Sequence, residues 1–260
     1  MPYVITVQGI YCFTGHLNTA MTSGNAIDIQ TNNVVLDLNG YKLGGLAAGP
    51  GTTTYGIHAV DRQNIILKNG TIRGFFAGIA LLDTGVSQGH LVEDMRADQN
   101  TYVGIQVSGS GNIIRNNQVV ATSGTTAFGA NANAYGIYVA GNGPRVLNND
   151  VIKVVGTGIF SGNGIYLAPS VTGGVVVNNR ITVADIGIVF DGSTGKYRDN
   201  VTFDVASPFL GGTDIGNNNY GMPRRGRGFG SRYADRLPAS QDVQEIRVPD
   251  ALLNLLQNKG

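Results

Sequence analysis

The chain has 260 residues, of which 39 are Gly, 42% are apolar, 13% are charged and none is Trp. Average chains carry about 25% charged residues and about 7% Gly, so this composition excludes coiled coils and ordinary helix bundles. Enough Val, Ile and Leu remain to bury a core, which excludes disorder. The formal net charge of +1 provides no broad electrostatic field for nucleic acid or anionic membranes.

Membrane and export signals are not expected in this chain. No apolar run approaches the roughly 18 residues of a membrane span. Residues 1–13 lack the basic start and the apolar stretch of a signal peptide. The single cysteine, Cys12, cannot form an internal disulfide, so cysteine usage does not indicate a compartment.

A Gly-Ile dipeptide recurs along most of the chain. Its copies begin at Gly56, Gly78, Gly104, Gly136, Gly164 and Gly187, with Ala26-Ile27 as an earlier, degenerate copy. Spacings between the Gly residues are 22, 26, 32, 28 and 23. Another apolar residue stands two positions after each Ile, which is the alternation of a strand with one buried face. The repeat therefore predicts one strand per copy with its Ile facing a core.

Each repeat holds two further strands at a steady offset. An Asn or Asp follows each repeat Gly by 12 to 16 residues, with an inward residue expected two positions before it and another three positions after it. Asn pairs occupy this bend at 116/117, 148/149 and 178/179. Asn tolerates left-handed backbone angles, and stacked amides hydrogen-bond along a stack. Amides are poor acids, bases and metal ligands, which favours a structural role for this column over a catalytic one.

These patterns together carry a resemblance to a known superfamily. The stretch 34–41, Val-Val-Leu-Asp-Leu-Asn-Gly-Tyr, is followed by Gly-Ile-x-Val and Asn-Asn-x-Val units, and it resembles the right-handed parallel β-helix, or pectin-lyase-like, superfamily. The resemblance covers about residues 4–219 and includes the opening strands of bacterial members. It implies an all-β solenoid of about seven three-strand rungs. The superfamily includes polysaccharide lyases, glycoside hydrolases, uronate epimerases, phage tailspikes and adhesins, so it implies a secreted or cell-surface location but no single activity.

The chain divides by composition into three parts. Residues 1–25 are expected to be N-terminal capping strands, 26–219 the parallel β-helix, and 220–260 a basic Gly/Arg linker with a helical tail. The last part holds seven Lys or Arg and four Asp or Glu. Residues 249–258 carry an apolar stripe at helical spacing after Pro249, which predicts a short C-terminal helix. We expect it to dock on the end of the solenoid or on a neighbouring subunit, the latter giving self-association. Nucleic acid is not the expected partner of the Arg-Gly stretch.

Long loops cluster at one corner of the predicted solenoid. They span 44–55, 122–135 and 156–163, and each precedes or follows a Gly-Ile strand. Insertions on one side of a solenoid often form a binding wall, although tolerated surface insertions give the same pattern. The loops therefore point to the outward face of the Gly-Ile strands as the place for a site.

One outward side chain per rung is expected beside those loops. The column contains Asp28, His58, Ala80, Gln106, Tyr138, Tyr166 and Val189. Tyr138 and Tyr166 should stack as neighbours, and with Gln106 they are the candidate substrate-binding residues. Aromatic side chains suit sugar rings, and their hydroxyls bond sugar oxygens. A Tyr ladder that only stabilises the sheet face is the alternative.

Asp28 and His58 are the candidate catalytic residues, because an imidazole beside a carboxylate is a positioned base. A glycoside hydrolase needs two acids about 5 to 9.5 Å apart. Asp185 and Asp191 are roughly 20 Å apart if extended, and Asp28 is about six rungs away, so a hydrolase is disfavoured. A uronate lyase or epimerase is a better match, although the Lys or Arg it needs is almost lacking on this face.

Glu93, Asp94 and Asp98 crowd one rung and are the candidate metal ligands, with Ca²⁺ as the expected ion if one binds. A solvated turn whose charges are relieved by Arg96 is the other interpretation. No other cofactor is expected. Two hypotheses remain: a glycan-recognising β-helix that binds or processes a polysaccharide, and a non-catalytic structural or adhesive scaffold.

Overall fold

A computed structural model describes residues 2–220, and within them nearly every regular element is a strand. The elements are β1 (Tyr3–Ile5), β2 (Gly9–Cys12), β3 (Leu17–Asn18), β4 (Asn25–Ile29), β5 (Val34–Asp37), β6 (Lys42–Gly44), the 3-10 helix η1 (Leu46–Ala48), β7 (Tyr55–Val60), β8 (Ile66–Arg73), β9 (Ala77–Leu82), β10 (Leu91–Asp98), β11 (Val103–Ser108), β12 (Ile113–Arg115), β13 (Gln118–Ser123), β14 (Ala134–Ala140), β15 (Arg145–Leu147), β16 (Asp150–Val155), β17 (Gly162–Leu167), β18 (Gly174–Val177), β19 (Arg180–Phe190), β20 (Gly195–Arg198), β21 (Val201–Leu210), β22 (Thr213–Asp214) and β23 (Asn219–Tyr220).

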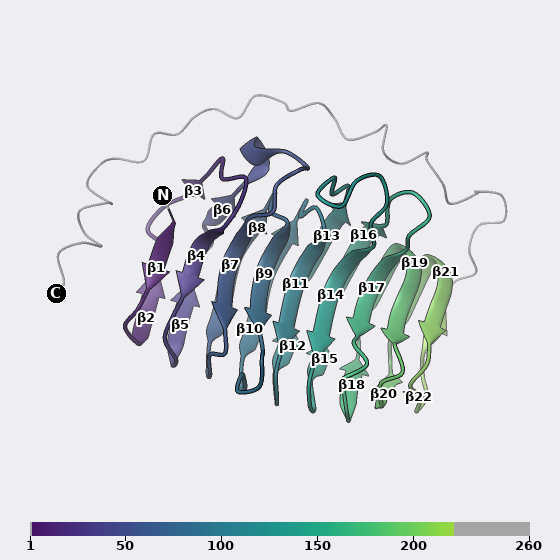
Figure 1. Ribbon diagram of the computed structural model, residues 1–260. Helices are drawn as coiled ribbons and strands as arrows, with labels where there is room; N and C mark the ends of the chain where they lie inside the picture. Colours follow the sequence, from purple (N-terminus) through teal and green to yellow (C-terminus); the bar gives the residue numbers. More distant parts are fainter. Residues whose placement is uncertain (1, 221–260) are drawn as a thin grey trace.

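The strands stack in parallel, each pairing with its counterpart one rung away (Figure 1). The Gly-Ile strands form one stack in the order β1, β4, β7, β9, β11, β14, β17, followed by the C-terminal parts of β19 and β21. The capping strands β1, β2 and β3 pair in parallel with β4, β5 and β6, so they continue the same stacks. The predicted all-β parallel β-helix is confirmed.

The core is a column of aliphatic side chains that runs through all rungs. Every repeat Ile from position 27 to 188 is at most 3% exposed, and the residues two positions later are buried as well. The inward residues of the second and third strands, such as Val146 and Val151, complete the same cluster. Burial of aliphatic surface stabilises by about 25 cal/mol per Å², so this shared core is what holds short strands in place.

The repeat Gly is required by close contact between rungs. A Cβ atom added to Gly136 would lie 2.5 Å from the carbonyl oxygen of Gly164 and 2.6 Å from a side-chain carbon of Val151. The equivalent atom on Gly104 would lie 2.6 Å from the carbonyl oxygen of Gly136. Each Gly therefore faces the core and its neighbour, and no larger residue fits.

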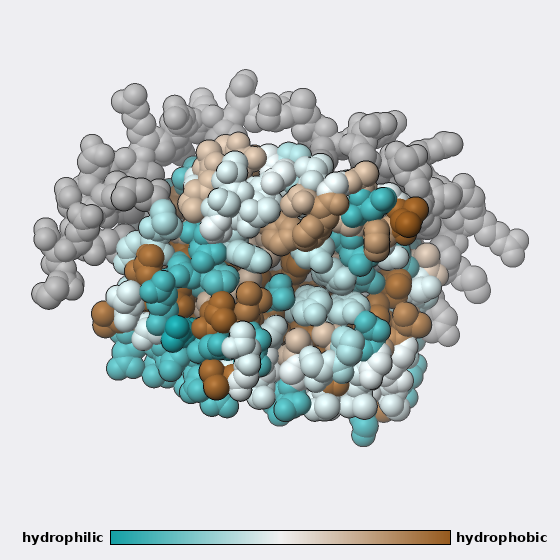
Figure 2. All heavy atoms as spheres, viewed as in Figure 1, coloured by the Kyte–Doolittle hydropathy of each residue, from teal (hydrophilic) through white to brown (hydrophobic). Residues whose placement is uncertain are grey.

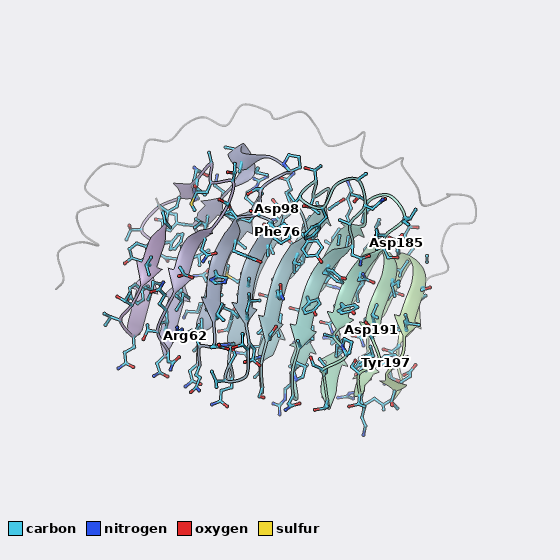
Figure 3. The ribbon with its side chains drawn as sticks, viewed as in Figure 1. Arg62, Phe76, Asp98, Asp185, Asp191 and Tyr197 are labelled. Atoms are coloured by element: carbon cyan, nitrogen blue, oxygen red, sulfur yellow. The ribbon has the colours of Figure 1, made fainter. Side chains whose placement is uncertain are left out.

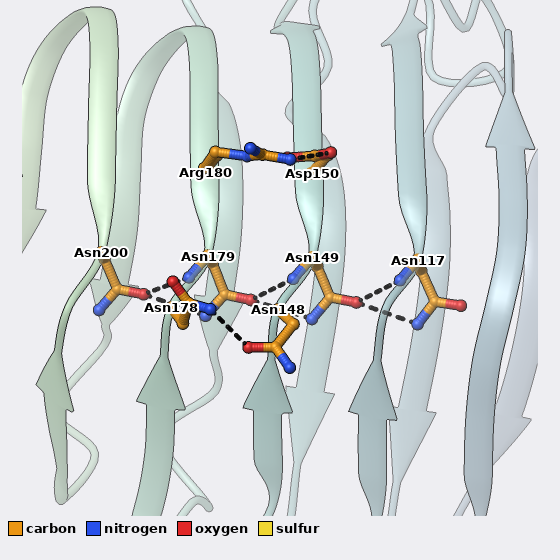
Figure 4. Close-up of polar contacts among 8 residues, drawn as sticks. All are labelled: Asn117, Asn148, Asn149, Asp150, Asn178, Asn179, Arg180 and Asn200. Atoms are coloured by element: carbon orange, nitrogen blue, oxygen red, sulfur yellow. Dashed lines mark hydrogen bonds and ion pairs between the residues drawn. The ribbon is translucent and has the colours of Figure 1, made fainter.

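A ladder of buried asparagines runs along the bend between the second and third strands (Figure 4). The Asn117 amide donates to Asn149 Oδ1 at 3.0 Å, Asn149 donates to Asn179 at 3.0 Å, and Asn179 donates to Asn200 at 3.0 Å. The preceding residue in each rung has a left-handed backbone, with φ of 56° at both Asn116 and Asn148. The two Asn of each pair thus have different tasks: the first makes the turn and the second makes the ladder.

The predicted C-terminal helix over 249–258 and the basic linker lie outside the described residues. Within residues 2–220, η1 has three residues, and no helix is long and apolar enough to cross a membrane.

Candidate functional site

The outward column predicted beside the loops is in register in the structure. Asp28 pairs with His58, which pairs with Ala80. Gln106 pairs with Ala80 on the rung before it and with Tyr138 on the rung after it. The column continues through Tyr166 to Val189. The candidate catalytic and substrate-binding residues therefore lie on one face of one stack of strands.

Aromatic rings form a continuous row over this face, which we call the aromatic strip; its members are Tyr55, Phe76, Tyr102, Phe128, Tyr135, Tyr138 and Tyr166. Tyr138 and Tyr166 stack with centroids 5.2 Å apart and an interplanar angle of 20°. Phe76 and Tyr102 stack at 4.8 Å, and Tyr135 joins the two stacks edge-on. The strip thus crosses five neighbouring strands, from β7 to β17.

The strip packs on a small apolar cluster outside the main core. Ala77, Ala80 and Val103 are buried there, with Tyr102 and Tyr138 packed against them. Figure 3 places Phe76 just before the start of β9, beneath the loops, and Asp191 lower on this face toward the later rungs. Figure 2 shows the same face in space-filling form, with the loops along its upper border.

Sequence reasoning found Tyr138 and Tyr166 but missed most of the strip. Strict alternation places the residue before each repeat Gly in the core. The Gly and the Ile after it both face inward, however, since a Cβ on Gly56 would meet the core side chain of Ile72 at 2.5 Å. Two consecutive inward residues turn the residue before the Gly outward, which is how Tyr55 and Tyr135 reach the strip. The signal was present in the sequence, as an aromatic residue directly before two repeat Gly residues.

The three long loops contact one another and form a wall along the strip. The Thr126 N–H donates to the carbonyl oxygen of Pro50 at 3.0 Å, which joins the first loop to the second. Thr157 N–H donates to the carbonyl oxygen of Ala132 at 2.8 Å, which joins the second loop to the third. Phe128 and Phe160 on these loops are 58% and 47% exposed. The wall therefore borders the strip with apolar, accessible side chains.

A hydrogen-bonded carboxylate and imidazole lie at the N-terminal end of the strip. His58 Nδ1 is 2.7 Å from Asp28 Oδ1, and the amides of Asn25 and Gln30 donate to the same carboxylate at 3.0 and 2.8 Å. Burial raises the pKa of Asp28, but these hydrogen bonds outweigh it and hold the pKa below the usual value. A proton on Nδ1 of His58 then satisfies the carboxylate and leaves Nε2 as an acceptor. This is the geometry of an oriented base.

The other end of the strip carries Asp191. The Tyr166 hydroxyl donates to Asp191 Oδ2. Burial, together with that hydrogen bond and the nearby carboxylate, raises the pKa of Tyr166, and burial raises the pKa of Tyr102 to about 12. The phenols are therefore neutral hydroxyls at physiological pH. Between these ends, the side-chain amide of Gln106 has no hydrogen-bond partner in residues 2–220.

The candidate metal ligands do not converge on one point. Glu93 binds Arg115 at 2.6 Å, and Asp98 lies 3.5 Å from Arg73 and 3.7 Å from Arg96. Asp94 occupies the bend between them with a φ of 52°. The part of the chain that the structure describes contains no group of three His, Cys, Asp or Glu side chains arranged to hold a metal ion.

The remaining imidazoles and the thiol are dispersed. His90 is buried, with Nδ1 accepting from the Ile65 N–H at 3.2 Å and Nε2 at 2.7 Å from Ser87 Oγ. His16 Nδ1 accepts from the Lys42 N–H at 3.0 Å, and Cys12 is exposed on β2. Each of these groups lies in a different local environment, away from the Asp28–His58 pair.

A shallow depression of about 170 Å³ lies on another face, lined by Asn148, Asp150, Asn178 and Arg180. Arg180 is held by Asp150 through two contacts of 2.5 and 2.7 Å. Its charge is already balanced, so the depression offers little to a ligand compared with the strip.

Comparison with protein families matches residues 3–162 to NosD, described as a periplasmic copper-binding protein family. No curated protein matches the chain. Among solved structures, the enzymatically active domain of tailspike protein 2 from bacteriophage CBA120 is similar, with a TM-score of 0.55 and 14% identity over 80% of this chain and 37% of that one. The Dettilon tailspike protein covers 84% of this chain and 54% of its own length at 13% identity and a TM-score of 0.48. The chain thus spans about a third to a half of these tailspike chains. The similarity to the CBA120 domain shows a shared fold and nothing more.

Proposed function

Because the chain belongs to the NosD family, whose fold is the right-handed parallel β-helix, we propose that it presents the aromatic strip as a binding groove for an oligosaccharide or polysaccharide chain. The observation that carries the proposal is the continuity of the strip across five strands, with three interlocked loops along one border. An extended ligand can lie across successive rungs, which are spaced about 4.8 Å apart.

The strip and the loops have complementary tasks in this proposal. The faces of Tyr138 and Tyr166 cover each other, so these rings offer edges and hydroxyls to a ligand. Phe128 and Phe160 are about half exposed and offer the apolar surface on which sugar rings pack. Gln106, between Ala80 and Tyr138 in the outward column, adds an amide donor and acceptor. Binding sites for uncharged ligands combine apolar surface with a few placed polar groups in this way.

Copper, which the description of the NosD family names, does not fit the described residues. Copper sites are built from His, Cys and Met ligands in close groups. All three His and the single Cys of the chain lie within residues 2–220, and no group of three His, Cys, Asp or Glu side chains is arranged there to hold a metal ion. Both ring nitrogens of His90 are already hydrogen-bonded, to the Ile65 N–H and to Ser87 Oγ. We therefore assign no role to copper in the groove. The family description does support a location outside the cytoplasm, in line with the secreted or cell-surface location expected from the sequence.

Asp28 and His58 are assigned the role of a base within this proposal, since they are an oriented pair at one end of the groove. A uronate lyase or epimerase also requires a positive group at the sugar carboxylate. No Lys or Arg lies on the Gly-Ile strands β4, β7, β9, β11, β14 and β17, so these strands do not supply that positive group. His58→Gln is expected to leave glycan binding intact and to abolish any turnover of the bound glycan, measured as reducing ends or unsaturated sugar.

The first test is a glycan array followed by titration calorimetry with the best ligand. Replacing both Tyr138 and Tyr166 by Ala is expected to weaken binding by about 1 kcal/mol or more per ring. Tyr41→Ala is the matched control, because Tyr41 is a partly buried tyrosine on the main core, away from the strip. Circular dichroism checks that each variant is folded.

Two outcomes would overturn the proposal. An unchanged affinity in the double variant would move the glycan site away from the strip. A wild type that binds no glycan on the array would favour the structural or adhesive scaffold, in which the tyrosine ladder only stabilises the sheet face.

A further inference from the structure

We infer that the groove selects glycans that carry neither carboxylate nor sulfate groups, an inference that rests on the proposed function. The aromatic strip, its loops and its two ends together create a surface whose fixed charge is negative. The inference assigns a chemical class to the ligand, and it follows from which ionisable side chains border the strip.

Positive charge is missing from the elements that build the groove. The strands β4, β7, β9, β11, β14 and β17 contain no Lys or Arg. The loops 45–54, 124–133 and 156–161 contain no charged residue of either sign. An acidic sugar lying on this surface would therefore find no guanidinium or ammonium partner, which is the group that recognises carboxylate and sulfate in proteins.

Negative charge is present at both ends and beside the loop wall. Asp28 lies at the N-terminal end with His58, and Asp191 lies at the other end with Tyr166. Asp185 accepts from the Gly162 N–H at 2.6 Å, where the third loop returns to its strand. The hydrogen bonds that lower the pKa of Asp28 keep its carboxylate ionised at neutral pH.

Three arginines on the elements beside the groove lie close in sequence or in space to carboxylates. Asp61 and Arg62 follow β7, and Asp83 follows β9 on the next rung, so this border carries two carboxylates and one guanidinium. Behind the loop corner, Arg73 and Arg96 both contact Asp98. Arg62, Arg73 and Arg96 all lie outside the Gly-Ile strands and outside the three loops, so none of these cations stands on the described elements that build the groove.

The polar groups that do face the groove are neutral. The Tyr138 and Tyr166 hydroxyls stay protonated because burial raises the pKa of both phenols. The Gln106 amide donates and accepts without charge. Such groups match the hydroxyl and acetamido groups of neutral sugars. A unit negative charge brought within about 8 Å of an ionised Asp at the protein surface is repelled by up to about tenfold in affinity.

The experiment compares pairs of oligosaccharides of equal length that differ only in charge, such as a neutral hexose chain and the same chain oxidised to uronate or sulfated. Affinities are measured at low and at high salt. The neutral member is expected to bind at least about tenfold more tightly at low salt, and the gap is expected to shrink at high salt because ions screen the repulsion.

Variants test the source of the discrimination. Asp28→Asn combined with Asp191→Asn keeps the amide oxygen as an acceptor and removes two negative charges, so it is expected to close most of the gap between the neutral and the charged member. Asp204→Asn is the matched control: it removes one charge from β21, outside the strip, at a position whose φ of 57° Asn tolerates. It is expected to leave the gap unchanged.

The outcomes separate this inference from the proposed function. Equal binding of neutral and acidic members, with both lost in the Tyr138→Ala, Tyr166→Ala double variant, would overturn the charge selection and leave the glycan groove standing. Binding of no array member would overturn the groove itself. A gap that persists in the Asp28, Asp191 double variant would show that shape, and not charge, excludes acidic sugars.

Discussion

Two of the three bends in each rung of the solenoid differ in almost every respect. The bend between the second and third strands, the Asn bend, carries an Asn pair in three successive rungs, at 116/117, 148/149 and 178/179, and the second amide of each pair is buried in a ladder. The bend between the third strand and the next Gly-Ile strand, the loop bend, changes in length from rung to rung and carries the wall beside the aromatic strip.

The difference shows how one chain separates stability from recognition. At the Asn bend the second Asn of each pair is buried and must find its partner one rung away, so a change of length or of that residue is costly. At the loop bend most backbone groups reach solvent or a neighbouring loop, so insertions are tolerated. Uniform spacing therefore marks the structural bend, and variable spacing marks the functional one.

The largest expected effect is at the Asn bend. Asn149→Ala removes four hydrogen bonds, to Asn117, Asn179 and the carbonyl oxygen of Ile114, and leaves buried partners unsatisfied. We expect the free energy of unfolding to fall by about 4 kcal/mol, measured by urea denaturation. Asn148→Gly is the control, since Asn148 is exposed and its φ of 56° suits Gly. Similar losses in both variants would contradict the division between the two bends.

The bend between the first and second strands gives the next effect, which depends on pH. Burial lowers the pKa of His90 to about 4 from an ordinary value of 6.5. Between pH 6.5 and 4, the His90 imidazole is therefore protonated in the unfolded chain but neutral in the folded chain. The free energy of unfolding falls as the pH falls through this range, by about 3 kcal/mol in all. His90→Gln is expected to flatten this part of the curve, measured by thermal unfolding between pH 4 and 7. An unchanged slope would mean that His90 is readily protonated in the folded protein.

The smallest effect on stability is expected at the loop bend. Replacing residues 127–131 by two glycines removes Phe128 from the aromatic strip but leaves the strands β13 and β14 intact. We expect the melting temperature to change by only a few degrees and glycan affinity to fall about tenfold. A large loss of stability with no loss of affinity would reverse the roles assigned to the two bends.

The sequence predicts the fold in detail because every rung of the solenoid buries side chains at equivalent positions. The inward columns of all three strands, the register from Asp28 to Val189 and the shared corner of the loops were predicted from spacing, and the structure has them in those places. When apolar residues recur at seven or more equivalent positions, the pattern indicates that these positions are buried, even when one copy, such as Ala26-Ile27, is degenerate.

The candidate site was harder to predict, because its residues do not repeat. Tyr55 and Tyr135 face outward only because the following Gly breaks the alternation, and Phe76 and Phe128 reach the strip from a bend and a loop. The Asp28–His58 contact was predicted from register, but the Asn25 and Gln30 hydrogen bonds that orient it depend on side-chain geometry that spacing does not report.

The Asn ladder also decides how such a chain can change its length during evolution. Each amide bonds only to the rungs directly before and after it, so the hydrogen bonds at the two seams of a duplicated rung would be the same as those already present. Copying residues 136–163, from one repeat Gly to the residue before the next, would add one whole ring of chain without disturbing its neighbours. The groove can thus grow or shrink in steps of about 4.8 Å, one gene duplication or deletion at a time.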